Sequence, residues 1–194
     1  MIKKAAVGLG ALVGLFLIIV ATRPAEYRVV RSVVVNAPAA VISGHIEDFH
    51  RWNAWSPWAK LDPKQKETFG GPPAGKDATY HWSGDDKVGE GSMKIAAVKP
   101  GERIDIALEF IRPFPSSSKV DFVLVPQGAG TQVSWGMDGT NNFLGKAFGL
   151  FVNMDKMLGA DFEKGLAQLK AAAEAEAAHA SAQAAKAAEP AATP

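Results

Sequence analysis

The stretch RIDIALEFIR, Arg103–Arg112, alternates apolar and polar side chains with a period of two. Positions 104, 106, 108 and 110 are Ile, Ile, Leu and Phe, whereas Arg103, Asp105 and Glu109 stand between them. Successive side chains of a strand point to opposite faces of a sheet. The stretch therefore predicts a strand with one buried and one wet face, as in an antiparallel sheet covered on a single side.

The same alternation recurs before and after this stretch. A valine-rich segment at 26–36 predicts a first strand, and Pro38 suits the start of a short helix. Turn signals rich in Gly, Pro and Ser separate the alternating segments, at 83–85, 100–101, 113–118 and 127–130. The further segments with period two are 78–82, 93–97, 120–124 and 133–137.

A helical pattern follows the last strand. From Leu144 to Leu169, large apolar residues recur at steps of three and four, which predicts one long helix with an apolar stripe. Such a stripe is what one face of a sheet needs as a cover. The order of elements therefore predicts an α+β fold within a folded domain at 26–170.

The chain ends differ in composition from this domain. Residues 171–194 are alanine-rich and low in complexity; we expect the first half to prolong the helix and the end to be disordered. At the other end, Lys3 and Lys4 precede an uncharged run at 5–22, which spans about 27 Å as a helix. This length is close to that of a bilayer core.

Two interpretations of residues 1–23 remain open. As a signal anchor, the segment is a transmembrane helix; as a signal peptide, it is cut after Ala21. We favour the anchor, because Ile19 is bulky for a cleavage position and Arg23-Pro24 follow at once. The short head before the run predicts a single-pass protein of the cell membrane with its domain on the periplasmic or extracellular side.

Composition argues against several classes of function. A formal net charge of +1 over 194 residues leaves no basic footprint for nucleic acid. Without cysteine there is no disulfide, thiolate metal site or cysteine nucleophile. The loop GGPPAGKD at 70–77 imitates a phosphate loop, but Asp77 would repel phosphate and two prolines remove backbone donors, so we expect no nucleotide. His45 and His50 lack a third ligand by spacing, and we expect neither a metal nor another cofactor.

Several motifs resemble one known superfamily. The sequence DFHRWNAWSPW at 48–58 resembles a signature of the START-related, polyketide cyclase-like (SRPBCC) superfamily, as do YHWSG at 80–84, VGEGSM at 88–93, GTQVSW at 130–135 and DFEKGL at 161–166. The resemblance implies a helix-grip fold, in which a curved antiparallel sheet wraps around a long C-terminal helix and leaves a cavity between them. It implies no particular reaction, because a fold does not specify a function.

The inward-facing residues are the candidate ligand contacts. Trp52, Trp55 and Trp58 recur every three residues, and we favour a buried plug for them over an aromatic cage. A pocket of this kind is mostly apolar. The residues predicted to line the cavity are Trp82, Met93, Ile106, Phe110, Phe122 and Trp135 from the sheet, and Phe148, Phe151, Met154 and Leu158 from the helix.

These features support three hypotheses of function. The first is a membrane-anchored binding protein for a hydrophobic small molecule, lipid-like or aromatic, in the cavity. The second is a polyketide cyclase/dehydrase-like or hydrolase-like enzyme that uses the same cavity, which an inward-facing titratable group with a shifted pKa would favour. The third is an interaction module, which a filled interior would favour. We favour binding over catalysis because no recognisable catalytic motif is present.

Overall fold

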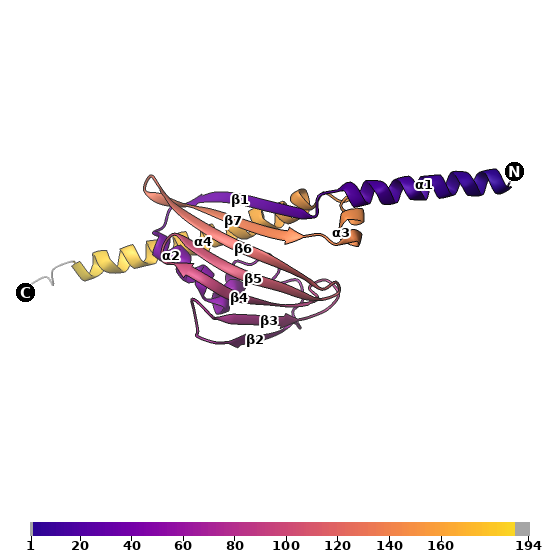
Figure 1. The fold of residues 1–194 in the computed structure, drawn as a ribbon. Helices are drawn as coiled ribbons and strands as arrows, with labels where there is room; N and C mark the ends of the chain where they lie inside the picture. Colours follow the sequence, from indigo (N-terminus) through magenta and orange to yellow (C-terminus); the bar gives the residue numbers. More distant parts are fainter. Residues whose placement is uncertain (1, 189–194) are drawn as a thin grey trace, which may run out of the picture.

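A computed structural model of the chain describes residues 2–188, with side chains at 4 and 8–187 (Figure 1). Its centre is one antiparallel sheet of seven strands in the order β1-β7-β6-β5-β4-β3-β2. The strands are β1 Glu26–Val35, β2 Lys66–Gly70, β3 Thr79–Ser83, β4 Glu90–Lys99, β5 Arg103–Arg112, β6 Ser116–Gln127 and β7 Gly130–Thr140.

The predicted strands are confirmed, and the structure adds one that was missed. Five alternating segments form β3 to β7, and the valine-rich segment forms β1. The short edge strand β2 lies in a stretch that is rich in breakers, and it pairs with β3 across the GGPPAGKD loop. This loop is therefore a hairpin connection. A bulge between Ile95 and Ala97 shifts the alternation in β4, so that Ala97 is exposed.

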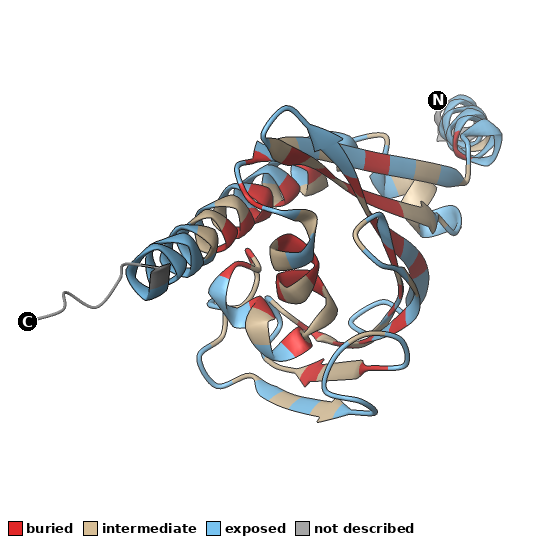
Figure 2. Cartoon of the chain, turned by 90° about the vertical axis from the view of Figure 1, so that its left-hand side faces the viewer, coloured by how far each residue is buried: buried red, intermediate tan, exposed pale blue. Residues whose placement is uncertain are grey.

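Short helices lie inside the curve of the sheet. Pro38 precedes α2, Ala39–Glu47, and a 3₁₀ helix, η1, follows at Phe49–Ala54. Asp48 begins η1, because its side chain accepts the backbone N–H of His50. Figure 2 shows the sheet curling around these helices, with their buried residues toward the strands.

The predicted long helix from 144 to 169 is wrong in its first part. The chain instead forms the short α3, Phe143–Phe148, a turn, and then α4, Met154–Ala188. Asn153 caps α4 by accepting the backbone N–H of Lys156 at 3.0 Å. The apolar pattern runs through the turn, but Gly149 and Asn153 interrupt the helix there.

Helix α4 is tied to strand β1 by charged side chains. Arg31 pairs with Asp155 at 3.0 Å and with Glu163 at 2.8 Å, and Lys170 donates to the Val34 carbonyl at 2.8 Å. The helix continues beyond the expected boundary at 170, where Ala173 is buried and Glu174 accepts the Asn36 N–H. The expected prolongation of the helix is thus found, but it reaches beyond the first half of the tail, to Ala188, where disorder was expected. Residues 189–194 of that end lie outside the described residues.

The N-terminal segment forms helix α1, Ile2–Thr22, which projects from one end of the domain and packs against α3 (Figure 1). Among the described residues, however, no helix combines the length and the apolarity that crossing a bilayer requires. The expectation of a transmembrane helix at 1–23 is therefore not supported. The fold is the α+β helix-grip arrangement of a curved sheet and a long C-terminal helix.

Candidate functional site

Strand register arranges the inner face of the sheet in rows. Met93 lies opposite Leu108, which lies opposite Ser118, and these form a row toward the end of the sheet that carries the β5–β6 turn. The next row inward contains Ile106 and Val120. These rows decide which side chains can meet a ligand, because neighbours in a row share one face at one depth.

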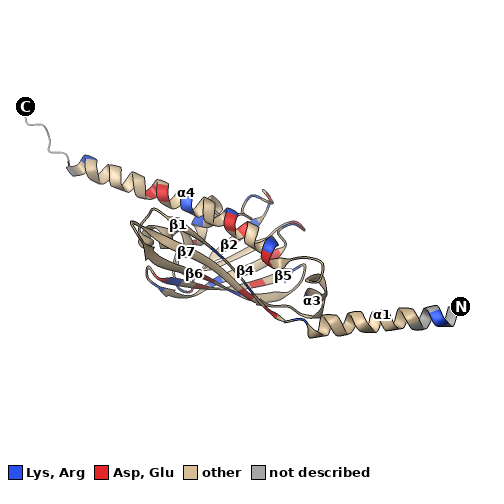
Figure 3. Cartoon of the chain, turned by 90° about the horizontal axis from the view of Figure 1, so that it is seen from above, with Lys and Arg blue, Asp and Glu red and all other residues tan. Residues whose placement is uncertain are grey.

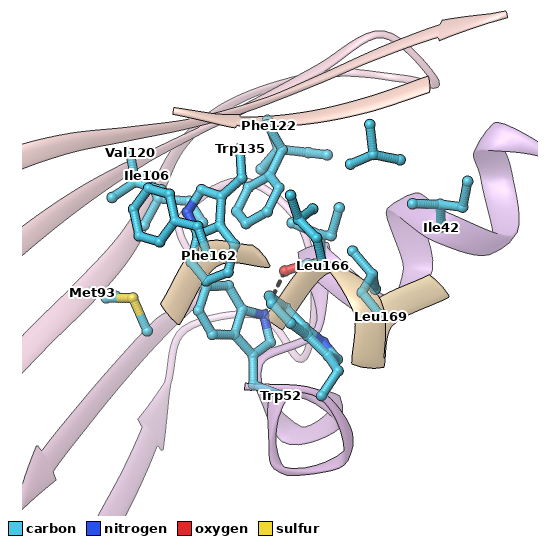
Figure 4. Close-up of a cluster of buried hydrophobic side chains, with 14 of the residues drawn as sticks. Ile42, Trp52, Met93, Ile106, Val120, Phe122, Trp135, Phe162, Leu166 and Leu169 are labelled. Atoms are coloured by element: carbon cyan, nitrogen blue, oxygen red, sulfur yellow. Dashed lines mark hydrogen bonds between the residues drawn. The ribbon is translucent and has the colours of Figure 1, made fainter. Parts of the chain in front are cut away.

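The row after Ile106 and Val120 is packed into a continuous aromatic core. Phe122 and Trp135 pair across β6 and β7, with ring centroids 5.1 Å apart. Phe162 of α4 stacks on Trp135 at 4.3 Å with nearly parallel planes. Figure 4 shows these rings filling the space between sheet and helix together with Trp52. The interior is therefore filled at this depth.

The plug interpretation of the tryptophans is confirmed for Trp52 and Trp55. Both are buried, and their indole N–H groups donate to the carbonyls of Ile46 at 2.9 Å and His45 at 3.1 Å. Trp58 is half-buried and packs edge-on against Trp135. The three rings close the interior instead of forming a cage.

Side chains of the inner face keep a slightly larger exposed fraction toward the end of the sheet where α3 lies. Met93, Leu108 and Ser118 are each 8% exposed, whereas the row of Ile106 and Val120 is 5% exposed or less. Closer to the β5–β6 turn than the row of Met93, Trp82 and Phe110 meet edge to face at 6.1 Å. We name Trp82, Met93, Leu108, Phe110 and Ser118 the open end of the sheet.

The ten predicted cavity residues do not line one common space. Trp82, Met93 and Phe110 lie at the open end, while Ile106, Phe122 and Trp135 belong to the filled interior. The inward orientation predicted for Phe148 and Phe151 is wrong: they are 54% and 81% exposed, because the helix breaks between them and α4. Leu158 packs at the margin of the core, and half-buried Met154 lines a surface hollow.

Sequence reasoning missed two residues of the open end. Leu108 belongs to the alternating stretch that decides the fold, but only strand register places it beside Met93. Ser118 lies in a segment with the composition of a turn, 113–118, and the structure places it within β6 facing inward.

The open end offers apolar contact and one hydroxyl. None of its five side chains titrates near neutral pH. The neighbouring Tyr80 stacks on Trp82 at 5.8 Å and donates to Glu67 at 3.0 Å. Burial, reinforced by the negative charge of Glu67, raises the pKa of Tyr80, so its phenol stays protonated. The arrangement is suited to binding apolar surface.

Two hollows lie outside the inner face. One, of about 260 Å³, is lined by Phe49, Thr79, the 70–73 loop and a stacked pair formed by His50 and Phe69. His50 is hydrogen-bonded to Asp48 at 2.8 Å. The other hollow, of about 430 Å³, lies where α1, α3 and the start of β1 meet, and its lining includes Arg23, Glu26 and Lys146.

A polar cluster joins α2, η1 and α4. His45 is buried, and its Nε2 lies 3.0 Å from a carboxylate oxygen of Glu176 and 3.0 Å from Arg51, which also pairs with Glu176. Burial, followed by the charge of Arg51, lowers the pKa of His45, although Glu176 opposes this. Its Nδ1 has no hydrogen-bond partner among the described residues.

The fold and its apolar inner face define a helix-grip protein, a class in which a curved antiparallel sheet wraps around a long C-terminal helix. The family model for "Polyketide cyclase / dehydrase and lipid transport" matches residues 26–174, and the chain belongs to this family. The superfamily resemblance drawn from the sequence motifs is thereby confirmed. No curated protein sequence matches the chain.

Solved structures share the fold at low sequence identity. A protein from Chromobacterium violaceum is 17% identical, with a TM-score of 0.55 over 78% of this chain and 99% of that one. A protein from Rhizobium leguminosarum is 13% identical, with a TM-score of 0.56 over 77% and 95%. DynU16, a protein of the dynemicin biosynthetic locus, is 17% identical, with a TM-score of 0.51 over 74% of this chain and 45% of that one. At such identities the likeness shows the fold alone.

Proposed function

We propose that the protein binds a hydrophobic small molecule at the open end of the sheet. The observation that carries this proposal is the change along the inner face from a filled aromatic core to the open end, where Met93 and Leu108 keep 8% of their surface exposed and Phe110 is half-buried. A ligand that covers Met93, Leu108 and Phe110 removes their remaining apolar surface from water. The family, which includes lipid transport proteins by its description, supports the same class of ligand.

The proposal includes association with a lipid membrane through α1. Leu15 to Ile19 are five consecutive apolar residues, all 38% to 62% exposed. At 3.6 residues per turn they point in every direction around the helix. A helix that is apolar all round needs a surrounding apolar medium.

Binding is tested by titrating the full chain with N-phenyl-1-naphthylamine, an apolar dye whose emission rises in an apolar site. A probe of about 17 heavy atoms at roughly 0.3 kcal/mol per atom would bind with about 5 kcal/mol, or a Kd of about 0.2 mM. Ser118→Phe places a ring in the row of Met93 and Leu108 and should abolish uptake. Ser117→Phe is the matched control, because the neighbouring side chain is exposed on the outer face.

The outcome separates binding from its main rival. If the wild-type chain never takes up the dye, or if both variants bind equally, no ligand enters at the open end. The filled interior would then favour the interaction module, in which the same fold presents its surface to a partner.

A further inference from the structure

Exposed large apolar side chains gather at the end of the domain from which α1 leaves. They come from the β5–β6 turn, from α3 and from the segment up to the first turns of α4, and their exposed fractions run from 46% to 81%. We name these residues the apolar end: Phe114, Phe143, Leu144, Phe148, Phe151 and Met157. Figure 1 shows α3 and the β5–β6 turn at the same end of the sheet.

Exposure of this extent is unusual for the surface of a folded domain in water. Six large apolar side chains at one end mark a surface that another apolar phase covers. They do not contribute to the interior, because the aromatic core is complete without them.

The properties of helix α1 indicate that lipid covers the apolar end. It is continuous with the apolar end through its packing against α3, and Figure 3 shows no charged residue on it beyond its N-terminal turn. A protein partner with one groove would cover a single face of such a helix, whereas lipid surrounds all faces. The lipid that surrounds α1 therefore extends to the apolar end, which lies where α1 joins the domain.

The charged residues near the C-terminal end of α1 are also compatible with a lipid surface. Arg23 and Lys146 line the hollow of about 430 Å³ with one carboxylate, Glu26. Lys156 is exposed in the first turn of α4, where the neighbouring Asp155 is paired with Arg31. The excess of cations beside apolar side chains suits the interface of a membrane that contains anionic lipids.

We infer that the apolar end lies in the interface of a lipid bilayer, so that the open end of the sheet faces lipid. Phe110 of the open end lies near the end of β5, and Phe114 of the apolar end lies in the β5–β6 turn that follows. An apolar ligand can then pass between bilayer and sheet without crossing bulk water. This inference rests on the proposed function, whose membrane association it extends from α1 to the folded domain.

The test uses the absence of native cysteine. Single-cysteine variants of the full chain carry an environment-sensitive nitrobenzoxadiazole label at four sites. Leu144→Cys and Phe114→Cys report the apolar end, Leu12→Cys reports α1, and Ala129→Cys reports the β6–β7 turn at the opposite end of the sheet. Each protein is mixed with vesicles of phosphatidylcholine and phosphatidylglycerol, with and without nitroxide-bearing lipid.

We expect nitroxide lipid to cause a large loss of emission at 12, 114 and 144, while the label at 129 keeps its emission. Loss at 12 alone would overturn the inference and leave the association through α1 intact. Retention at all four sites would overturn both, because the chain would not be at the bilayer. Dye uptake at the open end is measured separately, so its failure remains distinguishable. The circular dichroism spectrum of each variant verifies that it is folded.

Discussion

At the scale of single residues, Gly165 allows α4 to approach the sheet. A Cβ at this position would lie 2.7 Å from the ring of Trp135 and 3.0 Å from Pro57. The glycine is required by packing, because the backbone there is ordinary helix. Its small size permits the stack of Phe162 on Trp135 one turn earlier in α4.

Gly165→Ala should therefore destabilise the protein by about 1–3 kcal/mol through overpacking, although alanine favours a helix by about 1 kcal/mol. Urea unfolding, followed by circular dichroism, measures the free energy. Gly14→Ala in α1 is the control: a Cβ there would meet no atom within 4 Å, and the helix should gain about 0.5–1 kcal/mol. Equal effects of the two substitutions would contradict the close approach of α4.

At the scale of elements, three helical segments meet at one buried imidazole. His45 of α2 contacts Arg51 of η1 and Glu176 of α4, while the His45 carbonyl accepts the Trp55 indole. Glu176 lies beyond the boundary expected at 170, so the alanine-rich segment contributes a charged contact as well as the buried Ala173. The cluster joins the plug to the C-terminal helix.

This cluster makes folding stability depend on pH. Burial lowers the pKa of His45 in the folded protein below its unfolded value of about 6.5, so the unfolded chain binds the proton first as pH falls. Stability is complete above about pH 7 and is lost as pH falls through 6.5 toward the folded pKa. His45→Gln should flatten the dependence between about pH 7 and 5, measured by urea unfolding at each pH.

The control for this experiment is His179→Gln. His179 is exposed near the end of α4, so its replacement should leave the wild-type pH dependence in place. If the stability of His45→Gln still falls with pH as in the wild type, other groups cause the loss of stability at low pH.

At the scale of the whole molecule, the apolar end and the open end lie on the same side of the domain. If lipid covers the apolar end, apolar ligands can enter the open end directly from the bilayer. The ligand then reaches Phe110 by a short apolar path, and the rate of uptake depends on contact with the membrane as well as on affinity.

Leu144→Glu combined with Phe151→Glu should slow the uptake of dye preloaded in vesicles several-fold, because each carboxylate opposes insertion into lipid. Affinity for dye added in water should not change, because both side chains lie outside the open end. Stopped-flow fluorescence measures the rate. The control pair, Val125→Glu with Ala129→Glu, adds the same charge at the opposite end of the sheet and should leave the rate of uptake unchanged. If both pairs slow uptake equally, the effect is a general one of added charge.

The sequence by itself determined six of the seven strands of the folded domain and most of their buried faces. Alternation with period two depends on neighbouring positions alone, so β3 to β7 and the buried face of Arg103–Arg112 could be predicted before any contact was known. The motifs at 48–58 and 161–166 sufficed for the superfamily, and the family match confirms it.

Only the tertiary structure decided which apolar residues meet one another. Register across β4, β5 and β6 places Met93, Leu108 and Ser118 in one row, and no pattern within a single strand contains that information. The break at Gly149 turns Phe148 and Phe151 outward although their spacing continues that of α4, because helical periodicity does not reveal where a helix is interrupted. Whether apolar side chains fill a core or line a site depends on what packs opposite them, which is a property of the folded chain.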